Sequence, residues 1–438
     1  MSYTTRTTCR LCAADLLNTV LDLGEQPLAN EYPAAPGPQD AFPLYIVQCV
    51  SCGHVQNPVV VDPVRLFAHD YSYTSGTSPV FRKHLHDLAE GLFATGKRSL
   101  VDIGSNDGTL IGECRRRGMR ALGVDPACNL AVSASASGCL TIPAFFTVET
   151  AREIRRLMNG GPDVVTALNV FAHADDLGGI ADGVAELLDP GSTFVFEVAY
   201  IVDVVAKNEI GTLYSEHLST HSLGPLLPFF RARGLQVVDV ARTPIQGGSL
   251  RVFVKQRGTY AHEGRIAEVL RAEEGLELAL KQWPGRVAAE REAVAAELAP
   301  YLAQHGGPCK ACGGTSGNHP PHDPKPWGPC LVCRGHGHDY RPGTLAVYGA
   351  PARLTPWAYA MGFKPDDVTC VFDDEPRKVG RYTPGLNWPV VSSSELYERN
   401  PEAILISSWN YAENIKSRFP DYRGRWLVPP REPVSAAA

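Results

Sequence analysis

The stretch RSLVDIGSNDGTLIGECRRRG, residues 98–118, decides the fold of the central part of the chain. It opens with an apolar run typical of a buried strand, turns at residues 102–108, and continues with the apolar spacing of a helix. Glycines at positions 104 and 108 let the backbone of this turn approach a ligand closely. The turn is not G-x-G-x-x-G, and a single G-x-x-x-G is weak evidence for a nucleotide site.

A second strand supplies the context that the turn lacks. The apolar run at residues 122–124 ends in the carboxylate of Asp125. A carboxylate at the end of that strand can accept hydrogen bonds from both ribose hydroxyls of an adenosine ligand. Gly104 would then admit the ligand, and Asp102 would orient its amino acid portion through water or backbone amides.

Further apolar runs extend the pattern to a whole α/β domain. They lie at residues 140–142, 164–173, 192–200, 235–242 and 249–256. A short hairpin-like link joins the last two, so we expect five parallel strands that end in an antiparallel pair. This order is typical of a class I S-adenosylmethionine-dependent methyltransferase. An NAD-binding Rossmann domain or a plain α/β core is the alternative.

Length and composition exclude other classes of protein. At ~150 residues per domain, 438 residues correspond to about three domains. A net charge of −6 argues against a protein that mainly grips nucleic acid or an anionic membrane. No apolar run reaches the ~18 residues of a membrane span. The opening MSYTTRTTCRLCAAD lacks the pattern of a secretory signal, so we expect a reducing cytoplasm.

Eight of the twelve cysteines fall into four C-x-x-C pairs, which are Cys9/Cys12, Cys49/Cys52, Cys309/Cys312 and Cys330/Cys333. In a cytosolic chain such pairs indicate zinc more readily than disulfides. Four thiolates saturate tetrahedral zinc, so the first two pairs predict a structural site. A redox motif is the alternative. The last two pairs predict a second structural zinc site in a Gly/Pro/His-rich insert, where nearby histidines could compete as ligands.

These features divide the chain into five stretches. We expect a zinc-binding domain at 1–70, a methyltransferase domain at 71–257, a helical connector at 258–304, a zinc-binding insert at 305–343, and a Rossmann-like α/β domain at 344–438. The insert has three interpretations. It is a zinc-stapled loop, a surface for a protein partner, or a lid over the substrate.

Four local motifs carry chemically useful side chains. They contain Tyr71, Tyr73 and Ser75; Asn169 and His173; Tyr214, Glu216 and His217; and Ser249 and Arg251. Ligands bind at the carboxyl ends of strands in open α/β sheets, and the second and third motifs lie at those ends. A lone histidine is more often a packed loop or core residue. Two histidines together with a glutamate and a tyrosine at the same edge of the sheet favour a ligand-binding or catalytic site instead.

The chain resembles the nucleotide-sugar C-methyltransferases of deoxysugar biosynthesis, which methylate a carbon of TDP-4-keto sugars. The resemblance spans nearly the whole length. It rests on the zinc-type cysteine pairs near the start and on DIGSNDGTL, NVFAH, YxEH, GGSLR, YGAPAR, DDEPRKxGxYTPG and WNYAENI. The second cysteine quartet is not a usual part of that family, and Ser215, Ser219 and Thr220 depart from its pattern.

The resemblance implies a mechanism that general chemistry can rationalise. A carbon next to a ketone must lose a proton to a base, donors must hold the enolate, and the methyl group must lie in line. A neutral histidine suits the proton transfer. The resemblance implies His217 as the base, Glu216 beside it, and Tyr214 near the sugar. It also implies His173 and Tyr71 or Tyr73 as contacts of the keto oxygen, with no metal in this step.

The remaining site residues follow from the same resemblance. Cofactor contacts are expected from Asp102, Gly104, Ser105, Asn106, Gly108, Asp125, Asn169 and Ser75. The nucleotide-sugar is expected to contact Tyr348, Gly349, Ala350, Arg353, Lys378, Arg381, Ser249 and Arg251. The motif around position 350 leads into a helix N-terminus, which is a site for anions. A small packing domain without a ligand is the alternative for this C-terminal region. Arg353 stands where the family commonly has lysine. The positive charge is kept, but a planar guanidinium replaces a compact ammonium group.

We therefore expect C-methylation of a TDP-linked 4-keto deoxysugar by a monomer or weak homo-oligomer that binds neither nucleic acid nor membrane. Two other functions stay open at this point. One is methyl transfer to another small natural product on the same scaffold. The other is a zinc-bearing scaffold or chaperone-like module, against which the retained turn, Asp125 and the rim residues argue.

Overall fold

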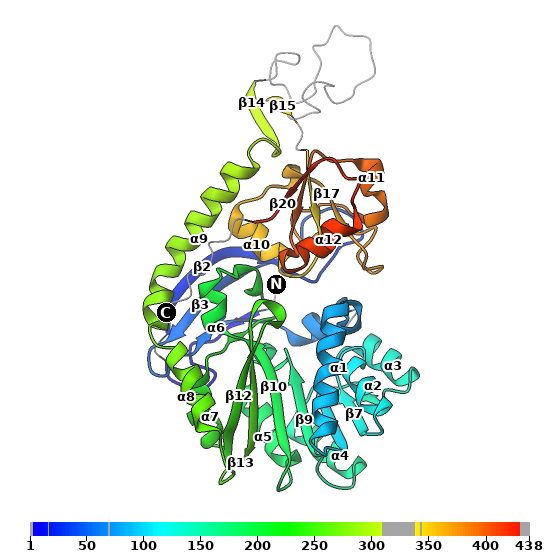
Figure 1. Ribbon diagram of the computed structural model, residues 1–438. Helices are drawn as coiled ribbons and strands as arrows, with labels where there is room; N and C mark the ends of the chain where they lie inside the picture. The colour runs from blue at the N-terminus through cyan, green and yellow to red at the C-terminus, as the bar shows by residue number, and fades with distance from the viewer. Residues whose placement is uncertain (1–2, 16, 69–70, 309–337, 342–343, 430–438) are drawn as a thin grey trace. The chain divides into compact units, whose positions relative to one another are not determined.

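The computed structural model of the chain describes residues 3–15, 17–68, 71–308, 338–341 and 344–429 (Figure 1). The described residues group into two compact units. One lies within residues 1–30 and 40–287, and the other within residues 31–39 and 288–431. No helix in these stretches is long and apolar enough to cross a membrane.

A seven-stranded sheet forms the centre of the first unit. Its strands are β6 Ser99–Ile103, β7 Arg120–Val124, β8 Thr141–Ile142, β9 Val164–Leu168, β10 Thr193–Ala199, β12 Leu235–Thr243 and β13 Ser249–Gln256. They pair in the order β12-β13-β10-β9-β6-β7-β8. The pairs from β8 to β10 are parallel, and β13 runs antiparallel to both of its neighbours. The expected class I methyltransferase sheet is confirmed.

Helices cover both faces of this sheet. They are α1 Pro79–Ala94, α2 Thr109–Arg116, α3 Cys128–Ala136, α4 Val148–Leu157, α5 Leu177–Leu187, α6 Ile201–Ala206, α7 Leu223–Arg231 and α8 Glu263–Ala272. The next helix, α9 Leu276–Leu298, is divided between the two units, with its residues up to 287 in the first and the rest in the second. Alternate strand residues point to opposite faces. Leu100 packs with α1 and α2, whereas Val101 packs with α4, α5 and α7. Because both faces of the sheet are buried, the sequences of its strands are nearly continuous apolar runs.

The cysteine-bearing start of the chain forms a small antiparallel sheet. It contains β2 Leu17–Pro27, β3 Ala41–Cys49 and β4 Val55–Gln56, and β11 Ser219–Thr220 pairs with β4 at its edge. A separate pair joins β1 Tyr3–Thr5 to β5 Val59–Val61. Because β11 comes from the methyltransferase region, the zinc region and the central sheet belong to one compact unit.

The second unit has a parallel sheet of its own. Its order is β18-β17-β16-β19-β20, with β16 Leu345–Tyr348, β17 Val368–Asp373, β18 Val390–Ser392, β19 Ala403–Ile406 and β20 Arg425–Leu427. Its helices are α10 Leu354–Met361, α11 Leu396–Arg399 and α12 Ala412–Arg418. The expected Rossmann-like architecture is present. The sequence did not indicate β18 or the inclusion of residues 31–39 in this unit.

The two ends of the predicted insert form an antiparallel pair. This pair joins β14 Gln304–Pro308 to β15 His338–Arg341. The four cysteines predicted to bind the second zinc ion, which are Cys309, Cys312, Cys330 and Cys333, lie outside the described residues. The possible partner surface predicted there lies outside them too.

Candidate active site and zinc site

The turn between β6 and α2 needs its two glycines. Gly104 has a φ of 67°, and a β-carbon there would lie 2.3 Å from Cγ2 of Val170. Gly108 has a φ of 78°, and a β-carbon there would lie 2.7 Å from the β-carbon of Cys139. Both positions combine a left-handed backbone with close packing, so other residues would displace the turn.

Asp125 at the end of β7 is held by backbone amides. Its carboxylate accepts hydrogen bonds from Asn106 N at 2.7 Å and from Ala127 N at 2.8 Å. The side chain is buried, and burial raises its pKa. Each carboxylate oxygen keeps a second lone pair, so the group can still accept hydrogen bonds from ribose hydroxyls.

Buried polar atoms without partners occur in this turn, directly after β9 and in α3. Among the described residues, the Ser105 hydroxyl, Nδ2 of Asn169 and Oδ1 of Asn129 make no hydrogen bond. Buried polar groups in proteins are normally satisfied, so these atoms suit a polar ligand. Together with the glycine turn they fit S-adenosylmethionine, whose amino acid and ribose portions are both polar.

Asp102 lies at the start of the same turn and is buried. It accepts a hydrogen bond from the Thr166 hydroxyl at 2.7 Å. Burial raises the pKa of Asp102 to about 7. A carboxyl group with this pKa changes its charge near neutral pH, which makes it sensitive to a cationic ligand.

The segment before α1 is fastened to the turn. Asn106 joins the two, because its Oδ1 accepts from Ser75 N at 2.8 Å and its Nδ2 donates to the Tyr73 carbonyl at 3.1 Å. Ser75, Asp102, Gly104 and Ser105 line one small pocket together with apolar residues of α1. The structure thus brings six of the eight predicted cofactor residues together at the carboxyl end of the sheet, namely Ser75, Asp102, Gly104, Ser105, Asn106 and Asp125.

Three aromatic side chains meet at the neighbouring rim. The ring centroids of His173 and His217 are 4.9 Å apart, and those of Tyr214 and His217 are 4.0 Å apart. Nδ1 of His217 lies 2.6 Å from the Thr212 carbonyl oxygen. A carbonyl can only accept, so Nδ1 carries the proton and the neutral ring has its lone pair on Nε2.

Glu216 is buried beside these rings. Its carboxylate accepts from Asn30 Nδ2 at 2.7 Å and from the Tyr71 hydroxyl at 3.2 Å. Burial and the Glu216 charge raise the pKa of Tyr71 well above its usual value, so the phenol stays protonated. Burial lowers the pKa of His173 well below 6.5, and the neighbouring His217 lowers it further. His173 is therefore neutral at physiological pH. Tyr73 is 38% exposed.

The hairpin residues predicted to contact the substrate have protein partners. Ser249 is buried, and its hydroxyl donates to the Ile245 carbonyl at 3.0 Å. Arg251 donates to the buried Glu197, whose other oxygen lies 2.7 Å from Nε2 of His84. A substrate contact of Ser249 and Arg251 stays a prediction.

The predicted nucleotide residues lie around the loop after β16 in the second unit. Ala350 N donates to Asp373 at 2.6 Å, and Lys378 Nζ donates to the Ala350 carbonyl at 2.7 Å. Arg381 donates to the Tyr32 carbonyl at 3.1 Å.

The other predicted nucleotide residues are Gly349, Tyr348 and Arg353. Gly349 has a φ of 95°. The hydroxyl of Tyr348 accepts from Arg418 at 2.9 Å, and the Arg353 guanidinium lies 5.7 Å from the Trp409 ring.

Sequence reasoning missed Asp373, which is the last residue of β17, much as Asp125 directly follows β7. Each carboxylate accepts from an amide of the loop after the preceding strand. The signal was present, because an aspartate follows the apolar run VTCVF. Asn30 and Thr212, which hold Glu216 and His217, carried no such signal, since neither belongs to a chemically distinctive motif.

The first cysteine quartet forms a compact cluster. The sulfur atoms of Cys9 and Cys52 lie 3.6 Å apart, as do those of Cys12 and Cys49, and all four lie within 4.8 Å of one another. Zinc–sulfur bonds of about 2.3 Å in a tetrahedron place sulfurs about 3.8 Å apart. The cluster therefore fits one zinc ion with no open position.

Three family profiles match the chain. They are a putative zinc binding domain at residues 9–67, a methyltransferase domain at 76–240 and a C-methyltransferase C-terminal domain at 339–429. C-methyltransferase NovU from Streptomyces niveus is 31% identical over 437 residues, which cover 97% of this chain and 96% of NovU. The chain belongs to this family of C-methyltransferases. It is an S-adenosylmethionine-dependent enzyme with an N-terminal zinc-binding domain.

Two solved methyltransferase structures are similar to part of the chain. Mitomycin 7-O-methyltransferase MmcR is 18% identical with a TM-score of 0.33, and the match covers 40% of this chain and 54% of MmcR. Magnesium protoporphyrin IX methyltransferase from Synechocystis PCC 6803 is 16% identical with a TM-score of 0.32, over 40% of this chain and 83% of that enzyme.

Proposed function

We propose that the enzyme methylates a carbon next to the ketone of a TDP-linked 4-keto deoxysugar. The observation that carries this proposal is the orientation of His217. Its Nδ1 lies 2.6 Å from the Thr212 carbonyl oxygen, so in the neutral form of the ring the lone pair is on Nε2, and the ring packs against those of His173 and Tyr214. This arrangement supports a general base rather than a packed core histidine.

In the proposed reaction, Nε2 of His217 takes the proton from the carbon next to the ketone. The electron pair of that C–H bond forms the enolate, whose oxygen needs a hydrogen-bond donor. His173 is neutral and offers one N–H for this purpose. The Tyr71 hydroxyl donates its hydrogen bond to Glu216, so it can donate to the keto oxygen only by exchanging that partner. S-adenosylmethionine supplies the electrophilic methyl group.

We assign the nucleotide portion of the substrate to the second unit. The loop after β16 leads into α10, and amides at a helix N-terminus suit phosphates. Lys378 and Arg381 supply positive charge near this loop, and the Asp373 carboxylate suits a ribose hydroxyl. Ser249 and Arg251 stay candidate sugar contacts. These assignments rest on the family resemblance and on the close similarity of the Asp373 and Asp125 arrangements.

The test is methyl transfer to a panel of nucleotide-linked keto sugars. We expect incorporation into a TDP-linked 4-keto deoxysugar, with mass spectrometry of the isolated sugar placing the new methyl group on carbon. The same sugar without its nucleotide should be a poor substrate, because binding energy from remote groups supports turnover. Binding of S-adenosylmethionine without methylation of any keto sugar would contradict the proposal and favour another small natural product as substrate.

We also propose a reducing cytoplasm as the compartment and a monomer or weak homo-oligomer as the working state. The first zinc site supports the compartment, because four zinc-binding thiolates persist best where thiols stay reduced. We also propose the domain boundaries that were predicted from the sequence.

A further inference from the structure

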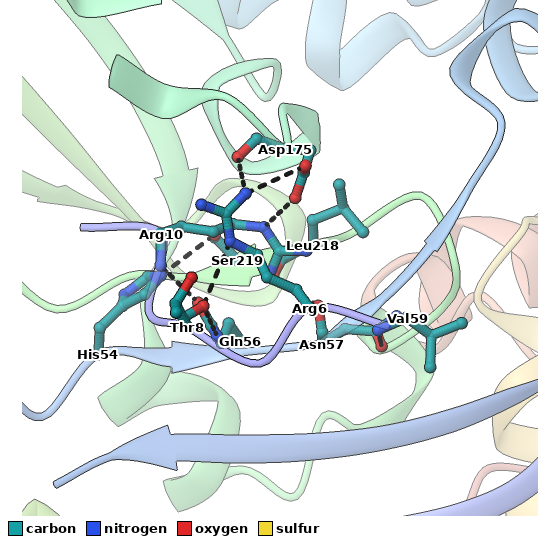
Figure 2. A network of polar contacts seen from close by, with 10 residues as sticks. All are labelled: Arg6, Thr8, Arg10, His54, Gln56, Asn57, Val59, Asp175, Leu218 and Ser219. Atoms are coloured by element: carbon teal, nitrogen blue, oxygen red, sulfur yellow. Dashed lines mark hydrogen bonds and ion pairs between the residues drawn. The ribbon is translucent and has the colours of Figure 1, made fainter. Parts of the chain in front are cut away.

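Arg10 stands between two zinc ligands, Cys9 and Cys12, and its guanidinium is fully buried. Figure 2 shows it extending from the zinc loop toward the methyltransferase region. Its Nε donates to Asp175 at 3.0 Å, and its Nη1 donates to the Leu218 carbonyl at 3.1 Å. Nη1 also donates to the Asn57 carbonyl at 2.7 Å. One planar fork therefore joins three separate segments of the chain.

Two of those segments carry the rim histidines. Asp175 comes two residues after His173, and Leu218 comes directly after His217. The two imidazole rings stack at 4.9 Å, so the separation of these segments sets the separation of the rings. A single guanidinium thus contacts the backbone just beyond the proposed base and the side chain just beyond the proposed enolate donor.

The zinc region holds the segment after His217 by further contacts. Asn57 N donates to the Leu218 carbonyl at 3.0 Å, and Nε2 of His54 lies 3.2 Å from the Ser219 hydroxyl (Figure 2). The short strand β11 pairs with β4, which places Ser219 opposite Gln56. The backbone beyond the proposed base is therefore a part of the zinc-region sheet.

The zinc loop in turn fixes Arg10. Its backbone N donates to Gln56 Oε1 at 3.0 Å, and Gln56 Nε2 donates to the Thr8 carbonyl at 3.2 Å. Zinc bound by Cys9 and Cys12 would fix the backbone on both sides of Arg10. A buried arginine that loses one partner leaves an uncompensated charge, so this arrangement resists small displacements.

We propose that Arg10 is a positioning residue that couples the first zinc site to the active site. Through Asp175 and Leu218 it sets the relative placement of His173 and His217, while zinc itself takes no part in the chemistry. This inference rests on the proposed function only in assigning catalytic roles to the two histidines. The bridge between the zinc loop and their segments stands on the contacts alone.

The test compares Arg10→Met with Arg6→Met as a matched control. Arg6 also pairs with Asp175, at 3.1 Å, but has no hydrogen bond to Leu218. In Arg10→Met we expect kcat to fall about 10–100-fold, because a displacement of about 1 Å has this effect on an aligned reaction. KM, zinc content and S-adenosylmethionine affinity should stay within about twofold of wild type. Arg6→Met should keep kcat, and Arg10→Lys should restore only part of it, since a point charge cannot replace the fork.

Hydrogen exchange measured by mass spectrometry gives a readout that does not depend on activity. Exchange in peptides spanning residues 212–222 should be faster in Arg10→Met, while peptides spanning residues 102–125 stay unchanged. Removal of zinc from wild type by a chelator should give the same change at 212–222. In Arg10→Met, zinc removal should add little there, because the coupling is already broken.

Normal kcat and normal exchange at 212–222 in a folded, zinc-loaded Arg10→Met would overturn the inference. If that variant loses zinc or unfolds, Asp175→Asn decides, because Asp175 is 41% exposed and lies outside the zinc loop. A lower kcat with faster exchange near residue 175 supports the bridge, and wild-type behaviour refutes it. Full activity of His217→Ala would refute the proposed function instead and leave the exchange result standing.

Discussion

At the residue scale, the site depends on groups that hold the reactive side chains in one state. The Thr212 carbonyl fixes the tautomer of His217, and burial keeps His173 neutral. Asn30 and Tyr71 both donate a hydrogen bond to the buried carboxylate of Glu216. The rim therefore combines the proposed base, a neutral histidine that can donate, and a carboxylate that accepts hydrogen bonds from two other side chains.

Asp102 is predicted to make cofactor binding depend on pH. Burial raises its pKa to about 7, so the carboxyl is largely protonated below that pH. A cationic cofactor nearby favours the carboxylate, so binding should release a proton. We expect the affinity for S-adenosylmethionine to rise with pH, by up to about tenfold per unit below pH 7, and to level off above it.

Calorimetry of wild type and Asp102→Asn across pH 5.5–8.5 checks this expectation. The neutral variant should lack the part of the pH dependence that Asp102 contributes, and its proton release should be smaller. Asparagine keeps an oxygen that can accept from Thr166, so the turn should stay folded. Identical pH profiles for the two proteins would show that Asp102 does not sense the cofactor charge.

The sequence singles out the proposed reactive residues but not the residues that contact them. His173, Glu216 and His217 belong to short motifs at strand ends, where the chemistry of the side chain is itself informative. Arg10 and Asn30 act through contacts with residues far away in the chain, and no local pattern reports such contacts. Arg10 stood between two recognised zinc ligands, yet its direction became visible only in the structure.

At the element scale, the turn between β6 and α2 is constrained by close packing around Gly104 and Gly108. We predict that Gly104→Ala lowers the affinity for S-adenosylmethionine by at least about tenfold and costs about 1–3 kcal/mol of stability. The reason is a left-handed backbone together with the approach of 2.3 Å to Val170. Calorimetry and thermal unfolding measure the two effects.

Gly96→Ala is the matched control for that variant. Gly96 has a φ of 86°, but a β-carbon there would meet nothing within 4 Å. It should therefore cost stability through backbone strain while leaving cofactor affinity unchanged. Equal losses of affinity in both variants would show that the contact with Val170 is not what constrains the turn.

Elements with their own periodicity were predictable, and elements created by pairing were not. The strands of the central sheet, such as β6 and β9, are apolar runs flanked by turn residues and helices. The strand β11 has two residues, and it exists because β4 offers an open edge. Residues 31–39 resemble a loop of the zinc region, yet Tyr32 donates to the Ala350 carbonyl at 2.6 Å in the second unit.

At the scale of the whole molecule, the zinc region and the central sheet form one compact unit. We predict that Cys52→Ser removes one zinc ion per chain and lowers the melting temperature of the methyltransferase region as well. The physical reason is that β11 and the Arg10 contacts join the two regions. Elemental analysis and calorimetric unfolding test this expectation.

Cys128→Ser is the control for the zinc variant, since Cys128 is exposed and stands apart from the cluster. It should keep the zinc content and melting temperature of wild type. Separate unfolding of the zinc region, with an unchanged transition for the sheet, would contradict the coupling. Whether the chain binds a second zinc ion at the other cysteine quartet is answered by the same elemental analysis of wild type.

The central claim is that His217 removes a proton from the carbon next to the ketone. Incubation of a TDP-linked 4-keto deoxysugar with enzyme in deuterated water, followed by mass spectrometry, measures this step before methyl transfer. We predict that wild type introduces deuterium at that carbon, that His173→Asn does so more slowly, and that His217→Ala does not, although it still binds S-adenosylmethionine. Deuterium uptake by His217→Ala at the wild-type rate would contradict the account.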